Sequence, residues 1–466
     1  MPRTSREPAD TVPYAPGRLP LLGHLIPMAT NPLGFFQGLA EFGPVVRIGL
    51  GPRTGYVVNS IPLVRQLLLD PAGSFDKGGP VFDALIAEVG NGLAKCPAAL
   101  HHRMRPLLQP AFRTNLMPRY AQVTARRTVD HIRAWKPGQI LDVSEEMSRL
   151  TTAALADGLL TDPVSQRALE QMQSDLPVSL RGIAVRAAIP WASRIPLPAN
   201  RRYDRAKRRT DRAIAEIVAA RGTDDPHQDL VSLMLAPEAS DLMDGALVRA
   251  NVWEFITGGT DTTAALLAWT LHLLVTHPVR YAELQAEIDG TLGPRTPTYD
   301  GLAGLPCLRR TLTEALRLYP PVWLLSRTTK HTTELGGHLL PAGADVYFCI
   351  AALHRDPAAF PAPDTFDPDR WLPGRTTREQ RDAFMPFSVG ARKCIGDVFG
   401  LTEASIALNV ILQHWRFAPA PGSNPSPRPS LSLHPRRLRL RIHPREGASA
   451  TTEGDTCPLP STPPPN

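Results

Sequence analysis

The ten residues Phe387-Ser-Val-Gly390-Ala-Arg392-Lys-Cys394-Ile-Gly396 lead into an apolar run with helical spacing. Cys394 lies just before that helix, where the helix dipole and the free N–H groups favour a thiolate. Gly390 permits a tight turn with positive φ, and Gly396 lets a flat ligand approach the helix closely. Arg392 offers a fixed positive fork to a carboxylate.

These side chains together suit one kind of ligand. Phe387 can shield the sulfur from water, and a thiolate beside an Arg and two glycines suits a planar, anionic cofactor that contains a metal. Haem held by a Cys thiolate is that case. A single free Cys is more often a buried structural thiol. The ten-residue pattern reverses this preference and predicts a haem ligand.

The composition of the chain excludes several classes of protein. The chain has 466 residues and 43% hydrophobic residues, enough for a large core and too many for a disordered protein. Five cysteines in so long a chain do not indicate a disulfide framework. The net charge of +7, from 51 basic and 44 acidic residues, is too diffuse to indicate nucleic acid. Neither a signal peptide nor a membrane span is visible, so we expect a cytoplasmic protein without a membrane anchor.

The spacing of apolar residues predicts a mainly α fold with a small β lobe. A β-hairpin is expected over 45–60, a helix over 62–69, and a long loop with a short helix inside over 75–93. Residues 99–285 have mainly helical spacing, with a long buried helix over 242–276. Further helices are predicted over 305–319 and 394–415.

The ends of the chain differ from its centre in composition. Residues up to about 34 are rich in Pro and Gly, which predicts an extended segment, and residues 1–15 are expected to form a flexible lead-in. Residues 446–466 are rich in Ser, Thr and Pro, which predicts a disordered tail. A single domain is therefore expected over 16–445.

The long predicted helix contains the motif Gly258-Gly259-Thr260-Asp261-Thr262-Thr263. Two glycines inside a helix cost roughly 1 kcal/mol each relative to Ala. A buried acid beside a hydroxyl is also costly unless it is hydrogen-bonded. The motif therefore predicts a groove for a small diatomic ligand and a route for protons. The alternative is a pair of packing glycines followed by a surface Asp and Thr.

The Cys loop matches all five fixed positions of Phe-x-x-Gly-x-Arg-x-Cys-x-Gly, and the chain thereby resembles the cytochrome P450 haem-thiolate monooxygenases. The resemblance covers roughly residues 16–445, with further motifs in the family's order. It implies the cytochrome P450 fold, with a long central helix over haem b. It also implies that Cys394 is the axial iron ligand, that Arg392 contacts a propionate, and that Asp261 and Thr262 are the catalytic residues of proton delivery. Gly258 stands where many members have Ala.

Glu314 and Arg317 lie one turn apart, which alone indicates a surface ion pair of little energy. They resemble the family's Glu-x-x-Arg, and residues 366–371 follow in order. The resemblance implies that Glu314, Arg317 and Arg370 form a buried network that supports the haem-side loop.

His101 and Arg105 share one helical face. The resemblance implies that both residues bind haem propionates and that Arg327 binds one as well. His102 and Arg103 are the alternatives if the register differs by one residue. Any of these side chains could instead be a solvated surface residue.

Three segments line the substrate pocket in the family, and here they carry mostly apolar side chains. Such a wall suits an apolar substrate held by shape, although the same positions are also ordinary core positions. Residues 75–80 and 196–202 resemble actinobacterial members that oxidise cyclic terpenes. The expected lining residues are Phe82, Leu85, Ile86, Phe255, Gly258, Val322, Trp323 and Leu324.

The resemblance thus implies an enzyme that inserts one atom of O₂ into a C–H bond of an apolar small molecule, a terpene of secondary metabolism. Fatty acids, macrolides and steroids stay open as substrates. A haem-binding sensor without turnover is the alternative of another class, which the intact Asp261-Thr262 pair disfavours. Electrons are expected from a separate ferredoxin and its reductase, which an excess of Lys and Arg near Cys394 would attract. We expect a monomer that binds no nucleic acid.

Overall fold

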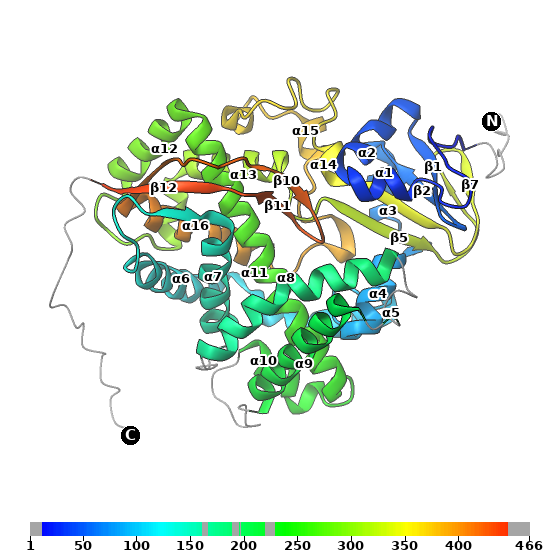
Figure 1. The fold of residues 1–466 in the computed structure, drawn as a ribbon, viewed down its shortest axis with the longest axis horizontal. Coiled ribbons are helices and arrows are strands. Elements are labelled where there is room, and N and C mark those ends of the chain that lie inside the picture. The colour runs from blue at the N-terminus through cyan, green and yellow to red at the C-terminus, as the bar shows by residue number, and fades with distance from the viewer. Residues whose placement is uncertain (1–11, 161–165, 189–194, 196, 220–228, 446–466) are drawn as a thin grey trace.

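The structure, a computed structural model, describes residues 12–160, 166–188, 195, 197–219 and 229–445. A large helical part and a smaller sheet-containing part lie side by side (Figure 1), which confirms the predicted fold class. The tail 446–466, residues 1–11 and Pro196 lie outside the described residues. Among the described residues, no helix is long and apolar enough to cross a membrane.

A five-stranded sheet forms the β lobe. Its order is β1 (Val45–Leu50), β2 (Arg53–Val58), β8 (Asp345–Cys349), β5 (Leu324–Thr329) and β3 (Phe75–Asp76). The hairpin β1–β2 pairs Val45 with Val58 and turns at Gly51, whose φ is 63°. This is the hairpin predicted over 45–60. The helix predicted after it is α3 (Ile61–Leu68).

The N-terminal segment is more ordered than its composition suggests. Two helices, α1 (Leu25–Thr30) and α2 (Pro32–Gly38), occupy the stretch expected to be extended, so that expectation is wrong. The Asn31 side chain accepts a hydrogen bond from the Gly34 N–H, and Pro32 occupies the first helical position. These are ordinary start signals of a helix. Val12 and Ala15 are buried, and Ala15 N–H donates to the carbonyl of Arg47 in β1.

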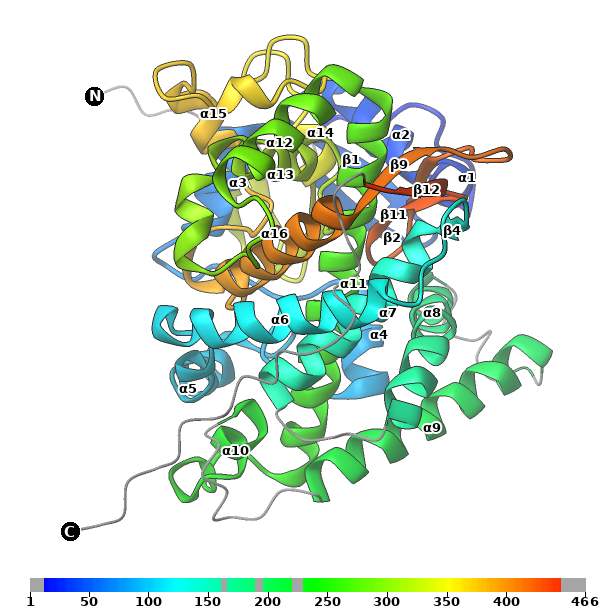
Figure 2. The same cartoon turned by 90° about the vertical axis from the view of Figure 1, so that its left-hand side faces the viewer.

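The central helix α11 (Gly245–Thr276) passes through the middle of the molecule in both views (Figures 1 and 2). Its 32 residues span about 48 Å at a rise of ~1.5 Å per residue. It begins at Gly245 because the Asp244 carboxylate accepts hydrogen bonds from the N–H groups of Ala246 and Leu247. It packs against α7 (Val143–Leu155), α13 (Pro306–Leu318) and α16 (Asp397–His414). These neighbours bury most of its surface.

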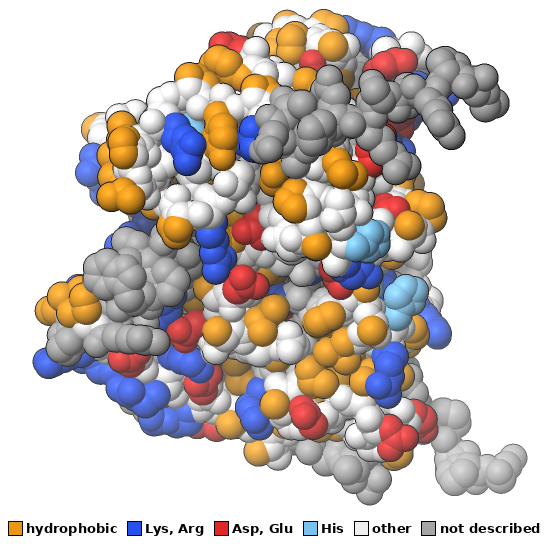
Figure 3. Space-filling model, turned by 90° about the vertical axis from the view of Figure 1, so that its right-hand side faces the viewer, with side chains coloured by type: hydrophobic (Ala, Val, Ile, Leu, Met, Phe, Trp, Pro, Cys, Tyr) orange, Lys and Arg blue, Asp and Glu red, His pale blue; other side chains and the backbone are white. Residues whose placement is uncertain are grey.

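The remaining elements surround this helix. The helices are α4 (Pro80–Val89), α5 (Ala98–Leu108), α6 (Met117–Ile132), α8 (Gln166–Ala188), α9 (Pro198–Ala219), α10 (Leu230–Leu235), α12 (Pro278–Thr291), α14 (Ile350–Leu353) and α15 (Arg378–Ala383). The strands are β4 (Ile140–Asp142), β6 (Thr333–Leu335), β7 (His338–Leu340), β9 (Trp415–Pro419), β10 (Ser426–Pro429), β11 (Leu433–Arg436) and β12 (Arg439–Pro444). The short helix expected within 75–93 is α4, and the helices expected over 305–319 and 394–415 are α13 and α16. On the face shown in Figure 3, basic, acidic and apolar side chains are interspersed.

Candidate functional site

The Cys394 loop is a closed turn that ends where α16 begins. The N–H of Cys394 donates to the carbonyl of Phe387 at 2.9 Å. Gly390 has a φ of +75°, and a Cβ there would lie 2.5 Å from the carbonyl oxygen of Leu68. The predicted positive φ is thus confirmed, and glycine is required both by the backbone angle and by the close approach.

The Cys394 side chain is exposed, although many protein atoms lie around its sulfur. Burial is the main cause that raises the pKa of its thiol, and a hydrogen bond from the Gly396 backbone acts in the opposite direction. The helix terminus alone therefore does not produce the thiolate that the sequence suggested. A coordinated metal cation would produce the thiolate, because metal coordination deprotonates a thiol outright. Gly396 faces the Phe112 ring, 3.4 Å from where its Cβ would be, so its contact with a cofactor stays a prediction.

One side of α11 faces open space at its middle. A Cβ built on Gly258 meets nothing within 4 Å, whereas one on Gly259 would lie 2.1 Å from Cδ1 of Leu155. The helix stays α-helical through both glycines. Thr262, one turn after Gly258, lies on the same side and donates its hydroxyl to the Gly258 carbonyl at 2.6 Å.

Asp261 turns away from that open side and toward the strands at the end of the chain. Its Oδ1 lies 2.9 Å from Nε2 of His434 in β11. Burial acts to raise the pKa of Asp261, but the charge of His434 and hydrogen bonds from His434 and Ser432 outweigh it and lower the pKa. The costly buried acid of the motif is thus compensated by partners that lie far from it in the sequence.

Basic side chains from four segments converge beside the Cys394 loop. We call this set the basic cluster; its members are Lys77, His101, Arg105, Arg327 and Arg392. Burial, followed by the charges of Arg327 and Arg392, lowers the pKa of Lys77 well below its usual value. Burial, and then the charges of Arg392 and Arg105, also lower the pKa of His101 to about 4. Burial lowers the pKa of Arg327 to about 10, with Arg392 contributing.

The acidic partners of the cluster are fewer than its cations. Arg392 donates to Asp76 at 2.9 Å and to the carbonyl of Cys96 at 2.8 Å, but its buried Nη1 has no partner among the described residues. Glu254 acts on Lys77 but also forms an ion pair with Lys95 at 2.5 Å. An enclosed surplus of positive charge is unfavourable unless an anion compensates it.

A haem fits this set of residues. Its carboxylates would supply the charge that the cluster lacks, and Cys394 would supply a sulfur ligand. The two parts of the site are connected through residues 95–96, because Arg392 of the Cys loop donates to the Cys96 carbonyl at 2.8 Å and Lys95 pairs with Glu254 at 2.5 Å. Glu254 lies one turn before Gly258, so this part of α11 lies near the Cys394 loop.

The structure also separates the candidates for the propionate contacts. His101 is buried beside Arg392, whereas His102 and Arg103 are exposed, so the predicted register of the helix is the one observed. Arg105 donates to the carbonyl of Lys393 at 2.7 Å and thereby holds the Cys loop. The contacts of these residues with haem stay predictions.

Glu314, Arg317 and Arg370 form one buried network. Arg317 donates to both carboxylate oxygens of Glu314 at 2.8 and 2.9 Å, and Nε of Arg370 lies 3.5 Å from Oε1. The side chains of Glu314 and Arg317 are 0% exposed. Arg317 also donates to the carbonyl of His354 at 3.0 Å. The structure thus brings together the three residues that the sequence grouped.

The residues expected to line the pocket fall into two groups. Phe82, Leu85, Ile86, Val322 and Leu324 are half-buried, and α4 has no fully buried residue despite its apolar sequence. In contrast, the Phe255 ring stacks on Phe112 at 5.5 Å, and Trp323 packs edge-on against Phe36 while donating to the carbonyl of Ser430. Both therefore have core partners, and the pocket role of all these residues stays a prediction.

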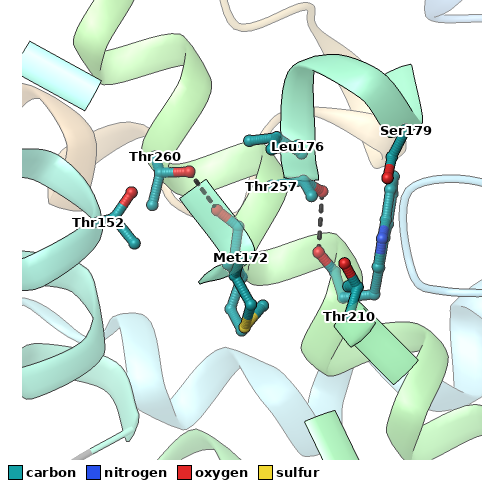
Figure 4. Close-up of a pocket in the computed structure, with 9 residues that line it drawn as sticks. Thr152, Met172, Leu176, Ser179, Thr210, Thr257 and Thr260 are labelled. Atoms are coloured by element: carbon teal, nitrogen blue, oxygen red, sulfur yellow. Dashed lines mark hydrogen bonds between the residues drawn. The ribbon is translucent and has the colours of Figure 1, made fainter. Parts of the chain in front are cut away.

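A small cavity lies against the side of α11 that carries Thr257 and Thr260 (Figure 4). Its volume is about 10 Å³, near the minimum for one water molecule. Thr257 and Thr260 of α11 face it together with Ser179 of α8 and Thr210 of α9. The hydroxyls of Thr257 and Thr260 are already bonded to carbonyls of their own helix. This cavity is too small for a substrate.

Sequence reasoning missed four residues of the site: Lys77, Asp76, Glu254 and His434. Lys77 and Asp76 both lie in the segment 75–80 that resembles terpene-oxidising relatives, and that resemblance was their available signal. Glu254 had only the weak signal of an acid between Trp253 and Phe255. His434 had none, since it lies 173 residues from Asp261.

Comparisons with known proteins agree with this geometry. Residues 13–442 match the family model described as Cytochrome P450. The chain is 41% identical to cyclooctatin synthase of Streptomyces melanosporofaciens, over 95% of this chain and 98% of that protein. It is 36% identical to pentalenene oxygenase of Streptomyces avermitilis, over 92% and 96%. The solved haem domain of a cytochrome P450DA mutant superposes with a TM-score of 0.81 at 28% identity, covering 94% of this chain and 98% of that one. The chain belongs to the cytochrome P450 family and is a haem-thiolate monooxygenase.

Proposed function

We propose that this monooxygenase inserts oxygen into a C–H bond of a cyclic terpene in secondary metabolism, with Cys394 as the axial ligand of its haem. The observation that carries the site assignment is the position of Cys394, in the turn before α16 and beside a basic cluster with too few acidic partners. The terpene assignment rests on the relatives, since cyclooctatin synthase and pentalenene oxygenase match nearly the whole chain.

The protein contributes binding, orientation and proton handling. When bound, the haem supplies the activation of O₂ that a thiolate ligand favours. Lys77, His101, Arg105, Arg327 and Arg392 would hold its carboxylates, and Glu314, Arg317 and Arg370 would keep the Cys loop in place. The missing side chain of Gly258 leaves room on the open side of α11. Asp261 holds and passes protons toward Thr262, whose hydroxyl borders the same space.

A cyclic terpene suits the half-buried apolar side chains of α4 and β5, which offer shape and few polar contacts. Fatty acids, macrolides and steroids are the competing substrates. Titrating the ferric protein with each class tests the proposal, because a substrate that displaces water from the iron shifts the haem spectrum. We expect pentalenene and cyclooctat-9-en-7-ol to shift it. A shift with fatty acids or macrolides and none with terpenes would contradict the terpene assignment.

The ligand assignment has its own test. The reduced, CO-bound protein should absorb near ~450 nm when a thiolate is the ligand. We expect Cys394→Ala to lose this band. Cys307→Ala is the matched control, because Cys307 is a half-buried free thiol elsewhere in the fold. A Cys394→Ala protein that kept the band would remove the basis of the assignment.

We also propose that a separate acidic ferredoxin and its reductase deliver the electrons. Lys393 is exposed beside Cys394, and its side chain pairs with Asp397. If charge guides docking, raising the salt concentration should slow ferredoxin-supported turnover. Turnover that is indifferent to salt would contradict this docking mode. The monomeric state and the cytoplasmic location remain predictions.

A further inference from the structure

The acid of the proton-delivery motif is joined to the β10–β11 hairpin. Nε2 of His434 lies 2.9 Å from Oδ1 of Asp261, and the Ser432 side chain also acts to lower the pKa of the carboxyl. The two paired side chains are only 19% and 15% exposed. A partly enclosed hydrogen bond between an acid and an imidazole is stronger than the same contact at the surface, because less water screens it.

His434 is held firmly in this position. The residue before it, Leu433, donates its N–H to the carbonyl of Pro321 at 2.9 Å. The carbonyl of Leu433 accepts a hydrogen bond from the Trp269 indole at 2.8 Å. Trp269 lies on α11 about two turns after Asp261. The hairpin is therefore fixed to α11 beside His434 independently of the ion pair.

The charges around Asp261 are simple. The groups that act on its carboxyl are the His434 imidazole on β11 and the Ser432 hydroxyl in the hairpin turn. No member of the basic cluster acts on it among the described groups. Thr262 and Gly258, its neighbours on α11, carry no charge. His434 is thus the only basic partner that acts on this acid among the described residues.

We propose that His434 positions Asp261 and is its immediate source of protons, an inference that rests on the proposed role of Asp261. The proton on Nε2 of the imidazolium moves to Oδ1 of the carboxylate. The N–H bond breaks and the O–H bond forms, so an ion pair becomes a neutral imidazole and a carboxylic acid. Asp261 then passes the proton toward Thr262, and solvent returns a proton to the partly exposed His434.

The competing interpretation is that the pair only tethers the hairpin. The bonds of Leu433 to Trp269 and Pro321 already do so, which makes a second tether redundant. The two interpretations differ in what a His434 variant changes. Loss of a tether lowers the unfolding temperature alone, whereas loss of a proton source changes the solvent isotope effect and the pH profile.

The experiment uses the haem-loaded enzyme and the compound that gives the largest spectral shift. We expect Asp261→Asn to slow product formation ~100-fold or more, the low end for removing a general acid. We expect His434→Gln to slow it roughly tenfold, because the acid stays but loses its proton source. His434→Gln should also enlarge the solvent deuterium isotope effect and divert electrons to peroxide. His331→Gln, which alters an exposed His elsewhere, is the control and should leave all three unchanged.

A readout without turnover separates this inference from the proposed function. In the CO complex, ¹³C NMR of carboxyl-labelled Asp identifies Asp261 as the signal absent from Asp261→Asn. We expect the titration of that signal to move to higher pH in His434→Gln. An unchanged titration, or a His434→Gln enzyme with the wild-type isotope effect, would overturn the inference. If instead Asp261→Asn forms product as fast as wild type, the proposed role of Asp261 in proton delivery is wrong. That outcome is independent of whether the Asp261 titration shifts in His434→Gln.

Discussion

The backbone N–H of Met385 donates to Nε2 of His354 at 3.0 Å. Nδ1 of the same ring lies 3.2 Å from the carbonyl of Arg317, so the ring is neutral with its proton on Nδ1. Met385 is two residues before Phe387, where the Cys394 loop begins. A single buried imidazole therefore connects the Glu314–Arg317 network to the loop that carries the cysteine.

This imidazole should make the protein sensitive to acid. Burial, and then the charge of Arg317, lower the pKa of His354 to about 3 from an ordinary value of 6.5. Below pH 6.5 the unfolded chain binds a proton that the folded protein does not, so stability falls as the pH falls toward 3. At pH 5 this loss is about 2 kcal/mol. We expect His354→Asn to be less stable at pH 7 but to lose less on going to pH 5, measured by urea unfolding. His331→Asn should behave as wild type, and an unchanged pH dependence in His354→Asn would contradict the prediction.

The two adjacent glycines of α11 should respond to Ala in opposite ways. Gly258→Ala meets open space, and we expect it to raise stability by about 0.5–1 kcal/mol through helix propensity. Gly259→Ala would force the buried Leu155 to move, and we expect a loss of about 1–3 kcal/mol. Each variant is the control for the other in thermal unfolding. Gly258→Leu should fold but abolish the substrate-induced spectral shift, and an undiminished shift would place the substrate elsewhere.

Glu403 on α16 should destabilise the protein at neutral pH. Its carboxyl oxygens are buried without a hydrogen-bond partner among the described residues, and burial raises its pKa to about 8 from 4.5. The nearby Thr263 hydroxyl acts to lower this pKa, but it donates to the Gly259 carbonyl. Between pH 4.5 and 8 the unfolded chain is ionised while the folded protein is not, so stability falls as the pH rises. The loss at pH 7 is about 3 kcal/mol.

We therefore expect Glu403→Gln to gain stability relative to wild type as the pH rises from 5 to 8. Urea unfolding at both pH values measures the gain. Glu238→Gln, which alters an exposed acid, is the control and should show no such trend. Parallel pH profiles of Glu403→Gln and wild type would mean that Glu403 is paired in solution.

Lys77 should contribute to haem retention. Removing a charged hydrogen bond to a carboxylate costs about 1.5–3 kcal/mol, or roughly ten- to a hundredfold in dissociation. We expect Lys77→Met to lose haem faster than wild type when excess apomyoglobin captures it. Lys330→Met, at an exposed position, should match wild type. Equal rates for Lys77→Met and wild type would exclude Lys77 from the propionate contacts.

The sequence predicted those parts of the site that short motifs encode. The positive φ of Gly390 followed from the turn that the Cys394 pattern requires. The grouping of Glu314 with Arg317 and Arg370 followed from the resemblance to the family, since spacing alone indicated a surface ion pair. Partnerships across the chain did not. The contact of His434 with Asp261 depends on how the β10–β11 hairpin packs, and that of His354 with Met385 on how the loop after α14 packs. The periodicity of apolar residues does not predict either packing. Phe255 and Trp323 were expected to line the pocket but have core partners. The sequence could not distinguish the two roles, because an apolar residue is equally suited to a pocket wall and to the core.

The hydroxyl of Thr262 has one hydrogen, and that hydrogen bonds to the Gly258 carbonyl at 2.6 Å. What the side chain can still offer to the open side of the helix is the lone pairs of its oxygen. In this arrangement the Thr262 hydroxyl is a hydrogen-bond acceptor. It can accept a hydrogen bond from a ligand that carries a hydrogen, but it cannot donate one to that ligand. Any proton used there has to arrive from elsewhere, and bringing it is the role proposed above for Asp261.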